Sequence, residues 1–377
     1  MEREDLARAR LSTGLGAALL EAGSLDRAAS ALDAAQRVAS VAGDQRVWAH
    51  ARIQQLFLGL QVDVKRATAA AAELLPGVLD IFEASGDELG LCKAWRLRAA
   101  VHWIQANSAA AEDAWQRAAV HARRAGDERQ LTEILGWLAS AALWGPTPAA
   151  DGIRRCERFL AEVGRQRTGE AVVLNHLAGL SAMRGHLARA HQLLARGRAI
   201  FDELGATMTS AVTHPASFVA MLTGDAAAAE AHLRQDYDSL QGMGEKGYLA
   251  TTAAFLAQAI AAQGRHEEAE HYVGVSREAA AGEDLSAQVV WQGTLARILA
   301  ARGQVGEAEE FARAAVTLAE RTDFLNQHAD ALVELAQVLT AAARTPAAQA
   351  AVGEALGLYE RKGNLIAAER ARQRARQ

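Results

Sequence analysis

The chain has 377 residues, of which 50% are apolar but only 5% aromatic, so alanine, leucine and valine supply most of the apolar content. Length alone would allow two or three globular domains. The 40 basic and 45 acidic residues leave a net charge of −5. This balance argues against a general nucleic-acid binder, because such proteins usually carry a basic excess.

The sequence carries no feature of secretion or membrane insertion. Cys92 and Cys156 are too few and too far apart for a disulfide framework, and they suit a reducing compartment. The charged N-terminus leads into no apolar signal-peptide core, and no window of about 18 residues is apolar enough to span a membrane. We therefore expect a soluble, cytoplasmic protein that does not bind a membrane.

Glycine marks a repeating break along the chain. Eight intervals separate Gly43 from Gly363, which gives a mean period of 40 residues. Glycine just past a helix end accepts the left-handed cap conformation, and a following Asp or Asn can start the next helix. A column of small residues keeps the same period, and in most units another glycine stands five residues before it. The breaks are Gly43, Gly86, Gly126, Gly164, Gly205, Gly244, Gly282, Thr322 and Gly363, and the small column is Ala28, Ala67, Ala111, Ala150, Ala190, Ala229, Ala269, Ala308 and Ala348.

These columns divide the chain into nine units of two helices each. No segment alternates with period two, so we expect no strand. In chain order the units span 1–43, 44–86, 87–126, 127–164, 165–205, 206–244, 245–282, 283–322 and 323–363, and 364–377 is expected to form a charged capping helix. Stacked units of this kind form a superhelix in which each repeat touches only its neighbours.

The pattern of large and small residues within a unit resembles the tetratricopeptide repeat (TPR). In the first unit Leu15-Gly16, Leu19, Ala28, Leu32 and Ala35 match the motif positions of that family. The resemblance implies an all-α, right-handed α-α superhelix. The period near 40 and the missing proline at the repeat ends are similar to the longer repeats of MalT-like sensor regions in large bacterial LuxR-type or cyclase-linked ATPase transcriptional regulators.

Two segments resemble chemical motifs without meeting their requirements. Gly242–Gly247 matches G-x-G-x-x-G, but the dinucleotide fingerprint needs a preceding strand and here we expect a turn between helices. His266 and His271 are five residues apart, whereas a zinc helix needs histidines at i and i+4 on one face. No nucleophile elbow, phosphate loop or paired catalytic carboxylate stands out. We therefore expect neither an enzyme nor a cofactor or metal.

In such a stack the first helix of each unit lines the concave wall. Arg96 and Asn175 are residue types that clamp a peptide backbone or a carboxylate, although simple solvation of the inner wall explains any one polar residue equally well. The candidate groove residues are Lys93, Arg96, Trp103, Asn175, His214, Phe218, Met221, Gln258, Arg297 and Gln337.

Six of the seven tryptophans lie in units two to four: Trp48, Trp95, Trp103, Trp115, Trp137 and Trp144. Trp95 and Trp115 occupy packing positions, whereas Trp103 and Trp144 fall near the groove, so that core packing and binding are both open for the cluster. His214-Pro215 is interpreted as the start of the first helix of unit six, where proline is tolerated. The terminal run from Arg370 to Gln377 is interpreted as a solvated helix tail rather than a nucleic-acid arm.

We expect a non-enzymatic binding module whose groove recognises a protein, a peptide or a small-molecule effector. By resemblance it would be the sensor or interaction region of a bacterial signal-transduction or transcriptional regulator. The alternative is a standalone scaffold that uses its outer face and ends to build an oligomer.

Overall fold

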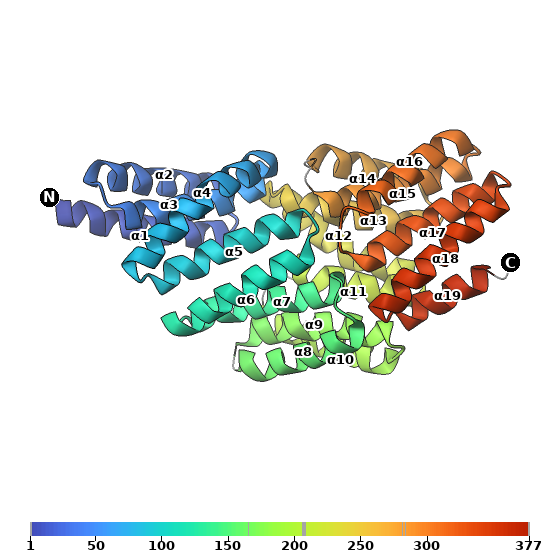
Figure 1. Cartoon of the computed structure of the whole chain (residues 1–377), viewed down its shortest axis with the longest axis horizontal. Helices are drawn as coiled ribbons and strands as arrows, with labels where there is room; N and C mark the ends of the chain where they lie inside the picture. Colours follow the sequence, from blue (N-terminus) through green and yellow to red (C-terminus); the bar gives the residue numbers. More distant parts are fainter. Residues whose placement is uncertain (1, 165, 206–208, 281, 283, 376–377) are drawn as a thin grey trace.

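The computed structural model describes residues 2–164, 166–205, 209–280, 282 and 284–375. Within these residues the chain forms 19 helices and no strand (Figure 1). In chain order they are α1 (Glu2–Glu21), α2 (Leu25–Ala42), α3 (Gln45–Val62), α4 (Val64–Ser85), α5 (Glu88–Ile104), α6 (Ser108–Ala125), α7 (Glu128–Trp144), α8 (Ala149–Val163), α9 (Arg167–Met183), α10 (Leu187–Leu204), α11 (Ser210–Thr223), α12 (Ala226–Met243), α13 (Gly247–Ala261), α14 (His266–Ala279), α15 (Leu285–Ala301), α16 (Val305–Ala319), α17 (Leu325–Ala341), α18 (Thr345–Lys362) and α19 (Leu365–Ala375).

Consecutive helices pair antiparallel, from α1 with α2 to α17 with α18, and α19 follows the last pair. The predicted all-α, TPR-like solenoid is confirmed. The division into units stays our proposal, because three predicted unit starts, at 165, 206 and 283, lie outside the described residues, as do 376–377 of the predicted cap. None of the helices in the described residues is long and apolar enough to cross a lipid bilayer.

The turn between α4 and α5 shows how a unit ends. Gly86 adopts the left-handed conformation with φ 61°, and the following N–H of Asp87 bonds to the carbonyl of Phe82 at 2.9 Å. The Asp87 carboxylate then accepts a hydrogen bond from the N–H of Gly90 at 2.9 Å, which caps the next helix. A glycine and an aspartate therefore end one helix and start the next within two residues.

Two alanines take the same strained conformation inside their units. Ala106 and Ala343 have φ of 50° and 55°, and they stand five residues before the small column, where most other units have glycine. A Cβ in this region meets the following carbonyl oxygen, which costs about 1 kcal/mol or more. The repeat geometry therefore imposes the turn even where the sequence lacks the favourable residue.

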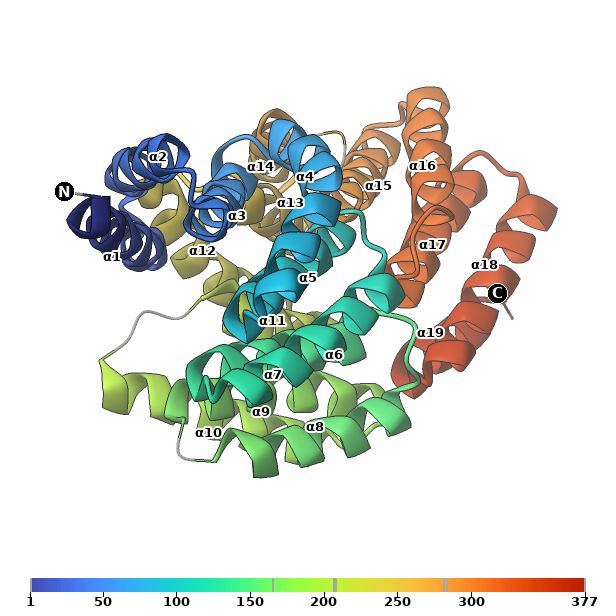
Figure 2. The same cartoon turned by 60° about the vertical axis from the view of Figure 1, so that its left-hand side comes forward.

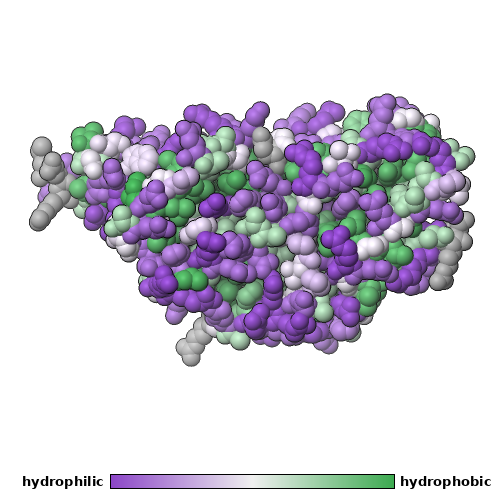
Figure 3. Space-filling model, viewed as in Figure 1, coloured by the Kyte–Doolittle hydropathy of each residue, from purple (hydrophilic) through white to green (hydrophobic). Residues whose placement is uncertain are grey.

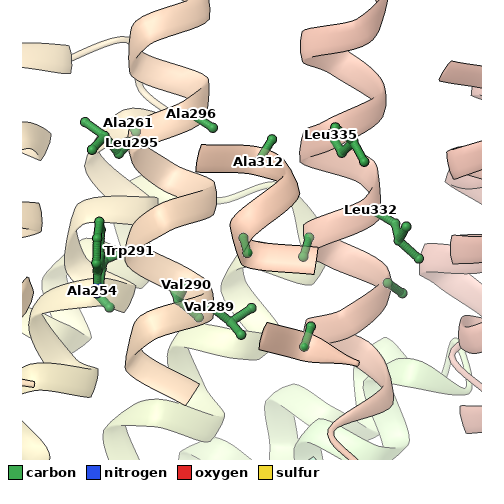
Figure 4. Close-up of a cluster of buried hydrophobic side chains, with 14 of the residues drawn as sticks. Ala254, Ala261, Val289, Val290, Trp291, Leu295, Ala296, Ala312, Leu332 and Leu335 are labelled. Atoms are coloured by element: carbon green, nitrogen blue, oxygen red, sulfur yellow. The ribbon is translucent and has the colours of Figure 1, made fainter. Parts of the chain in front are cut away.

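Small residues let the helices approach closely, as Figure 4 shows for the cluster around α13, α15, α16 and α17. Ala254, Ala296 and Ala312 are fully buried there beside Trp291 and Leu332. The large side chains fill the grooves that the alanines leave between helices. This packing explains how a core with few aromatic residues stays dense.

The expectation that each repeat touches only its neighbours is wrong. The helices α17–α19 curve back towards α6–α9 (Figures 1 and 2). The carboxylate of Asp323 accepts hydrogen bonds from the N–H groups of Ser108 and Ala109 at the start of α6, both at 2.7 Å, and its own N–H bonds to the carbonyl of Ala106 at 3.1 Å. Unit nine is thereby joined to unit three across more than 200 residues of sequence.

Lys362 makes a second contact of this kind and is fully buried. Its ammonium donates hydrogen bonds to the carbonyls of Ala142, Gly145 and Thr147 at 2.8, 2.6 and 2.8 Å. All three donors of the group are satisfied, and the acceptors lie at the C-terminal end of α7, where the helix dipole favours a cation. The end of α18 is thereby attached to the turn that follows α7.

Aromatic rings fill the space between these two parts of the superhelix. The ring of Trp103 lies 5.2 Å from that of Phe324, and Trp144 stacks on Phe255 at 6.0 Å. Trp137 stacks on Tyr248 at 6.4 Å. Three of the tryptophans of units three and four, namely Trp103, Trp137 and Trp144, therefore pack against the C-terminal half.

Candidate ligand cavity

A cavity of about 240 Å³ opens on the inner wall of the C-terminal half. Most of its walls come from α11, α13, α15 and α17, the first helices of units six to nine, and from α19. Trp144 of α7, Leu233 of α12, Tyr359 of α18 and Asn364 also line it. Five predicted groove residues take part in it: Phe218, Met221, Gln258, Arg297 and Gln337. The structure thus brings these five residues together, and their role in binding stays a prediction.

Aromatic side chains form one part of the lining. Trp144 meets Phe218 edge to face at 5.5 Å and stacks on Phe255 at 6.0 Å. All three side chains are only partly buried, so their ring faces are available to an apolar group. Phe255 was not among the predicted residues; it stands three residues before Gln258 on the same helix, which could have indicated it.

Polar and charged groups form another part of the lining. Arg297 donates a hydrogen bond to Glu334 at 3.0 Å and makes a second, shorter contact with the same carboxylate. The carboxylate raises the pKa of Arg297, so the guanidinium stays charged. Tyr359 donates to Asp330, and burial raises the pKa of that carboxyl group to about 6. These two pairs place ionisable groups in the lining of the cavity.

Arg370 and Arg374 of α19 also line the cavity. The interpretation of this run as a solvated helix tail agrees with the described part of the helix, but it did not indicate a contact with the cavity. Both arginines are exposed, but with Ala367 and Ala371 they form one face of α19 that meets the cavity. Their spacing of three and four residues in the sequence could have indicated this shared face, because residues with that spacing lie on one side of a helix.

Three predicted residues lie away from the cavity, in unit three. Trp103 packs between Trp115 and Phe324. Arg96 donates hydrogen bonds to Gln130 and Glu133. Lys93 is largely buried, and burial lowers its pKa. The structure does not join these residues to the cavity in units six to nine, and a binding role for them stays a prediction.

Asn175 and His214 are buried with partners of their own. Asn175 is 2% exposed and donates to the carbonyl of Ala171 at 2.8 Å. His214 bonds to the hydroxyl of Thr252 at 2.8 Å, and burial lowers its pKa. Pro215 lies within α11, which begins at Ser210, so the interpretation of His214-Pro215 as a helix start is wrong. The helix starts earlier because Thr209 is the extended N-cap and its carbonyl already accepts the first hydrogen bonds, from the N–H groups of Val212 and Thr213.

The glycine-rich segment is a turn, as predicted. Gly244 caps α12 in the left-handed conformation and α13 begins at Gly247, so the preceding element is a helix and not a strand. His266 and His271 lie on α14. Among the described residues no three or more histidines, cysteines or acidic groups are arranged to hold a metal ion.

No protein-family model matches the chain, and no curated protein matches it. Among solved structures it is similar to a Rap protein complexed with competence and sporulation factor, with 12% identity, a TM-score of 0.48 and coverage of 98% of this chain and 96% of that one. It is also similar to the apo form of the quorum sensor NprR from B. thuringiensis, with 12% identity, a TM-score of 0.41 and coverage of 66% and 74%.

A third similar structure is a signal transduction ATPase with numerous domains and a tetratricopeptide repeat sensor from Pyrococcus horikoshii. The identity is 10%, the TM-score is 0.48, and the match covers 82% of this chain but 52% of that one. Similarity at this level concerns the fold alone. The paired helices described above make the protein a TPR-like helical-repeat protein.

Proposed function

We propose that the protein is a non-enzymatic binding module and that its ligand or partner group enters the cavity between α11, α13, α15, α17 and α19. In this proposal it serves as the sensor or interaction region of a bacterial signal-transduction or transcriptional regulator with MalT-like repeats. The candidate groove residues run from unit three to unit nine, and we assign binding only to the cavity in units six to nine. In units three and four Trp103 and Trp137 pack against Phe324 and Tyr248 of the C-terminal half and fill the space there.

One observation carries the proposal: the cavity combines partly buried aromatic side chains with a small number of polar groups. Ligand sites typically pair an apolar wall with a few placed donors and acceptors. Gln258 and Gln337 add uncharged amide groups to the lining. No reactive constellation accompanies them, so that recognition rather than catalysis is the function that the lining supports.

Gly293 offers a way to test the cavity. It is buried on α15 in the lining, and a Cβ at this position would meet only the Cγ of Glu334, at 3.6 Å. The substitution Gly293→Leu should therefore keep the helix and fill the cavity. Gly274→Leu on α14 is the matched control, because a Cβ there has no neighbour within 4 Å and the residue is outside the lining.

The experiment is native mass spectrometry of chains purified gently from the native host. A discrete extra mass on the wild type and on Gly274→Leu, but not on Gly293→Leu, supports the proposal. The same extra mass on Gly293→Leu would place the ligand outside the cavity.

The scaffold alternative has one observation in its favour. Leu11 and Leu15 of α1 are 76% and 53% exposed, and they lie on one face of the helix. Under this alternative the wild type carries no small ligand, and the charged substitution Leu15→Glu lowers the oligomer mass. An unchanged mass after this substitution would contradict an assembly role for α1.

A further inference from the structure

The charged groups around the cavity are unevenly balanced. The lining includes three basic residues, Arg297, Arg370 and Arg374, and two acidic ones, Asp330 and Glu334. The cavity therefore has an excess of one positive charge in a chain whose net charge is −5. A local field opposite in sign to that of the whole molecule favours an anionic ligand.

Internal partners account for one of the three cations. Arg297 is paired with Glu334, and Asp330 accepts the hydroxyl of Tyr359. Among the described residues Arg370 and Arg374 take part in no ion pair, whereas Arg372 between them pairs with Glu360 and Glu369. The two unpaired guanidinium groups are on the cavity side of α19, and the paired one is outside the lining.

The position of the two arginines on α19 suits a joint contact. They are four residues apart and thus lie on one face of the helix. A terminal nitrogen of Arg370 comes within 3.9 Å of the place where a Cβ on Gly224 would lie, so its guanidinium reaches the end of α11. Arg374 is close enough to Asp330 to oppose the rise in the pKa of that carboxyl group. Figure 2 shows α19 beside α18, against which it packs.

The aromatic part of the lining can bind the apolar part of a ligand. Trp144, Phe218 and Phe255 offer flat apolar surfaces in the same cavity. Planar guanidinium groups bind carboxylates and related oxyanions through two parallel hydrogen bonds. Together these surfaces match a ligand with a ring at one end and an oxyanion at the other.

We propose that the cavity takes an aromatic organic anion, whose ring contacts Trp144, Phe218 and Phe255 and whose carboxylate or similar group is bound by Arg370 and Arg374. This inference rests on the proposed function and adds the chemical class of the ligand. Both a small aromatic acid and the C-terminus of a peptide that ends in an aromatic residue have this chemistry.

The test compares two fluorescent dyes with a similar aromatic frame. Anilinonaphthalene sulfonate carries an anionic group and N-phenylnaphthylamine carries none. The wild-type chain should bind the sulfonate at least about tenfold more tightly than the neutral dye, because charge-assisted hydrogen bonds are the stronger kind. Arg370→Gln and Arg374→Gln should each weaken the sulfonate about tenfold and leave the neutral dye unchanged.

Two controls separate a binding role from a structural one. Arg372→Gln is on the same helix but outside the lining, and it should leave both affinities unchanged. Gly293→Leu should weaken both dyes because it fills the cavity. Parallel losses of both dyes in Arg370→Gln and Arg374→Gln would show that the arginines support the helix only, and would overturn the inference.

The remaining outcomes distinguish this inference from the proposed function. Equal affinity for the two dyes, with both weakened by Gly293→Leu, overturns the anion inference and leaves the cavity as a binding site. Insensitivity of both dyes to Gly293→Leu, or no binding of either dye, contradicts the proposed function as well. A displacement experiment then distinguishes the two sources of the anion. Displacement of the sulfonate by naphthylacetate alone indicates a small acid, whereas displacement by a tetrapeptide with a C-terminal phenylalanine, but not by its amide, indicates a peptide. If neither compound displaces the sulfonate, the carboxylate assignment is overturned.

Discussion

The closure of the superhelix depends on Asp323, and the substitution Asp323→Ala tests it. The carboxylate accepts two backbone hydrogen bonds of 2.7 Å at the start of α6, from Ser108 and Ala109. Ser108 is buried and Ala109 is exposed, so water can replace the lost partner at only one of the two N–H groups. Alanine removes both bonds and leaves the first turn of α6 without this anion.

The expected loss of stability is about 3 kcal/mol, because a hydrogen bond to a charged group contributes about 1.5–3 kcal/mol and water restores part of one of them. The matched control is Asp225→Ala. Asp225 caps α12 through the N–H of Ala228 at 2.9 Å, three residues away in the sequence. Loss of a local cap costs about 1 kcal/mol, and it removes no contact between distant units.

Two measurements distinguish the variants. Urea denaturation followed by far-ultraviolet circular dichroism gives the change in the free energy of unfolding, and small-angle X-ray scattering gives the radius of gyration. Asp323→Ala should lose more stability than Asp225→Ala and should have a larger radius at unchanged helix content. Equal losses in the two variants, with equal radii, would refute the assignment of Asp323 as a contact that closes the superhelix.

Three further predictions follow from buried groups and from the strained turns. Burial lowers the pKa of Lys362 from 10.5 to about 7, so the unfolded chain binds this proton more tightly and Lys362 contributes a gain in stability between pH 7 and 10. The change in the free energy of unfolding over this interval should therefore be less favourable in Lys362→Met than in the wild type by about 3 kcal/mol or more in urea denaturation. An equal change in both chains would contradict the shift. Ala343→Gly should raise the free energy of unfolding by about 0.5 kcal/mol, because glycine relieves the strain of a left-handed alanine. Ala106→Gly should raise it less, because the buried Cβ of Ala106 packs against Leu285 and Phe324. Thermal denaturation compares the two variants, and a larger increase in Ala106→Gly would argue against this packing. Burial raises the pKa of Cys92 to about 11 and that of Cys156 to about 12, so Ellman's reagent should titrate them only after unfolding, and rapid reaction of the native chain at neutral pH would show that the thiols are accessible.

Much of the fold was predictable because its determinants are local. Gly86 and Asp87 end one helix and begin the next through hydrogen bonds within a few residues, and the alanine column sets the approach of two helices inside one unit. The wall formed by Phe218, Gln258 and Arg297 followed from the same register. Such interactions repeat every 40 residues, so they leave a periodic pattern that the sequence displays directly.

The parts that the sequence did not indicate involve residues from distant units. The sequence placed Trp144 near the groove, but its contact with Phe255 exists only because unit four lies against the C-terminal half. Arg370 is exposed as expected for a solvated tail, and it borders the cavity only because α19 lies beside the inner wall. Asn175 shared the predicted register and is nevertheless buried with a partner on its own helix. The surroundings of Trp144 and Arg370 depend on neighbours far away in the chain, whereas Asn175 is buried by its own helix and by Gly197 of the adjacent α10.

The sequence by itself determined the helices, their pairing and the class of solenoid, because capping and small-to-large packing act within one unit or between adjacent units. Only the tertiary structure decided how far the superhelix closes, since closure is the sum of small rotations over many units. The contacts that close it, such as that of Asp323 with Ser108 215 positions away, occur once and therefore leave no periodic pattern. The same closure decides which part of the inner wall is filled by tryptophan and which part remains open as a cavity.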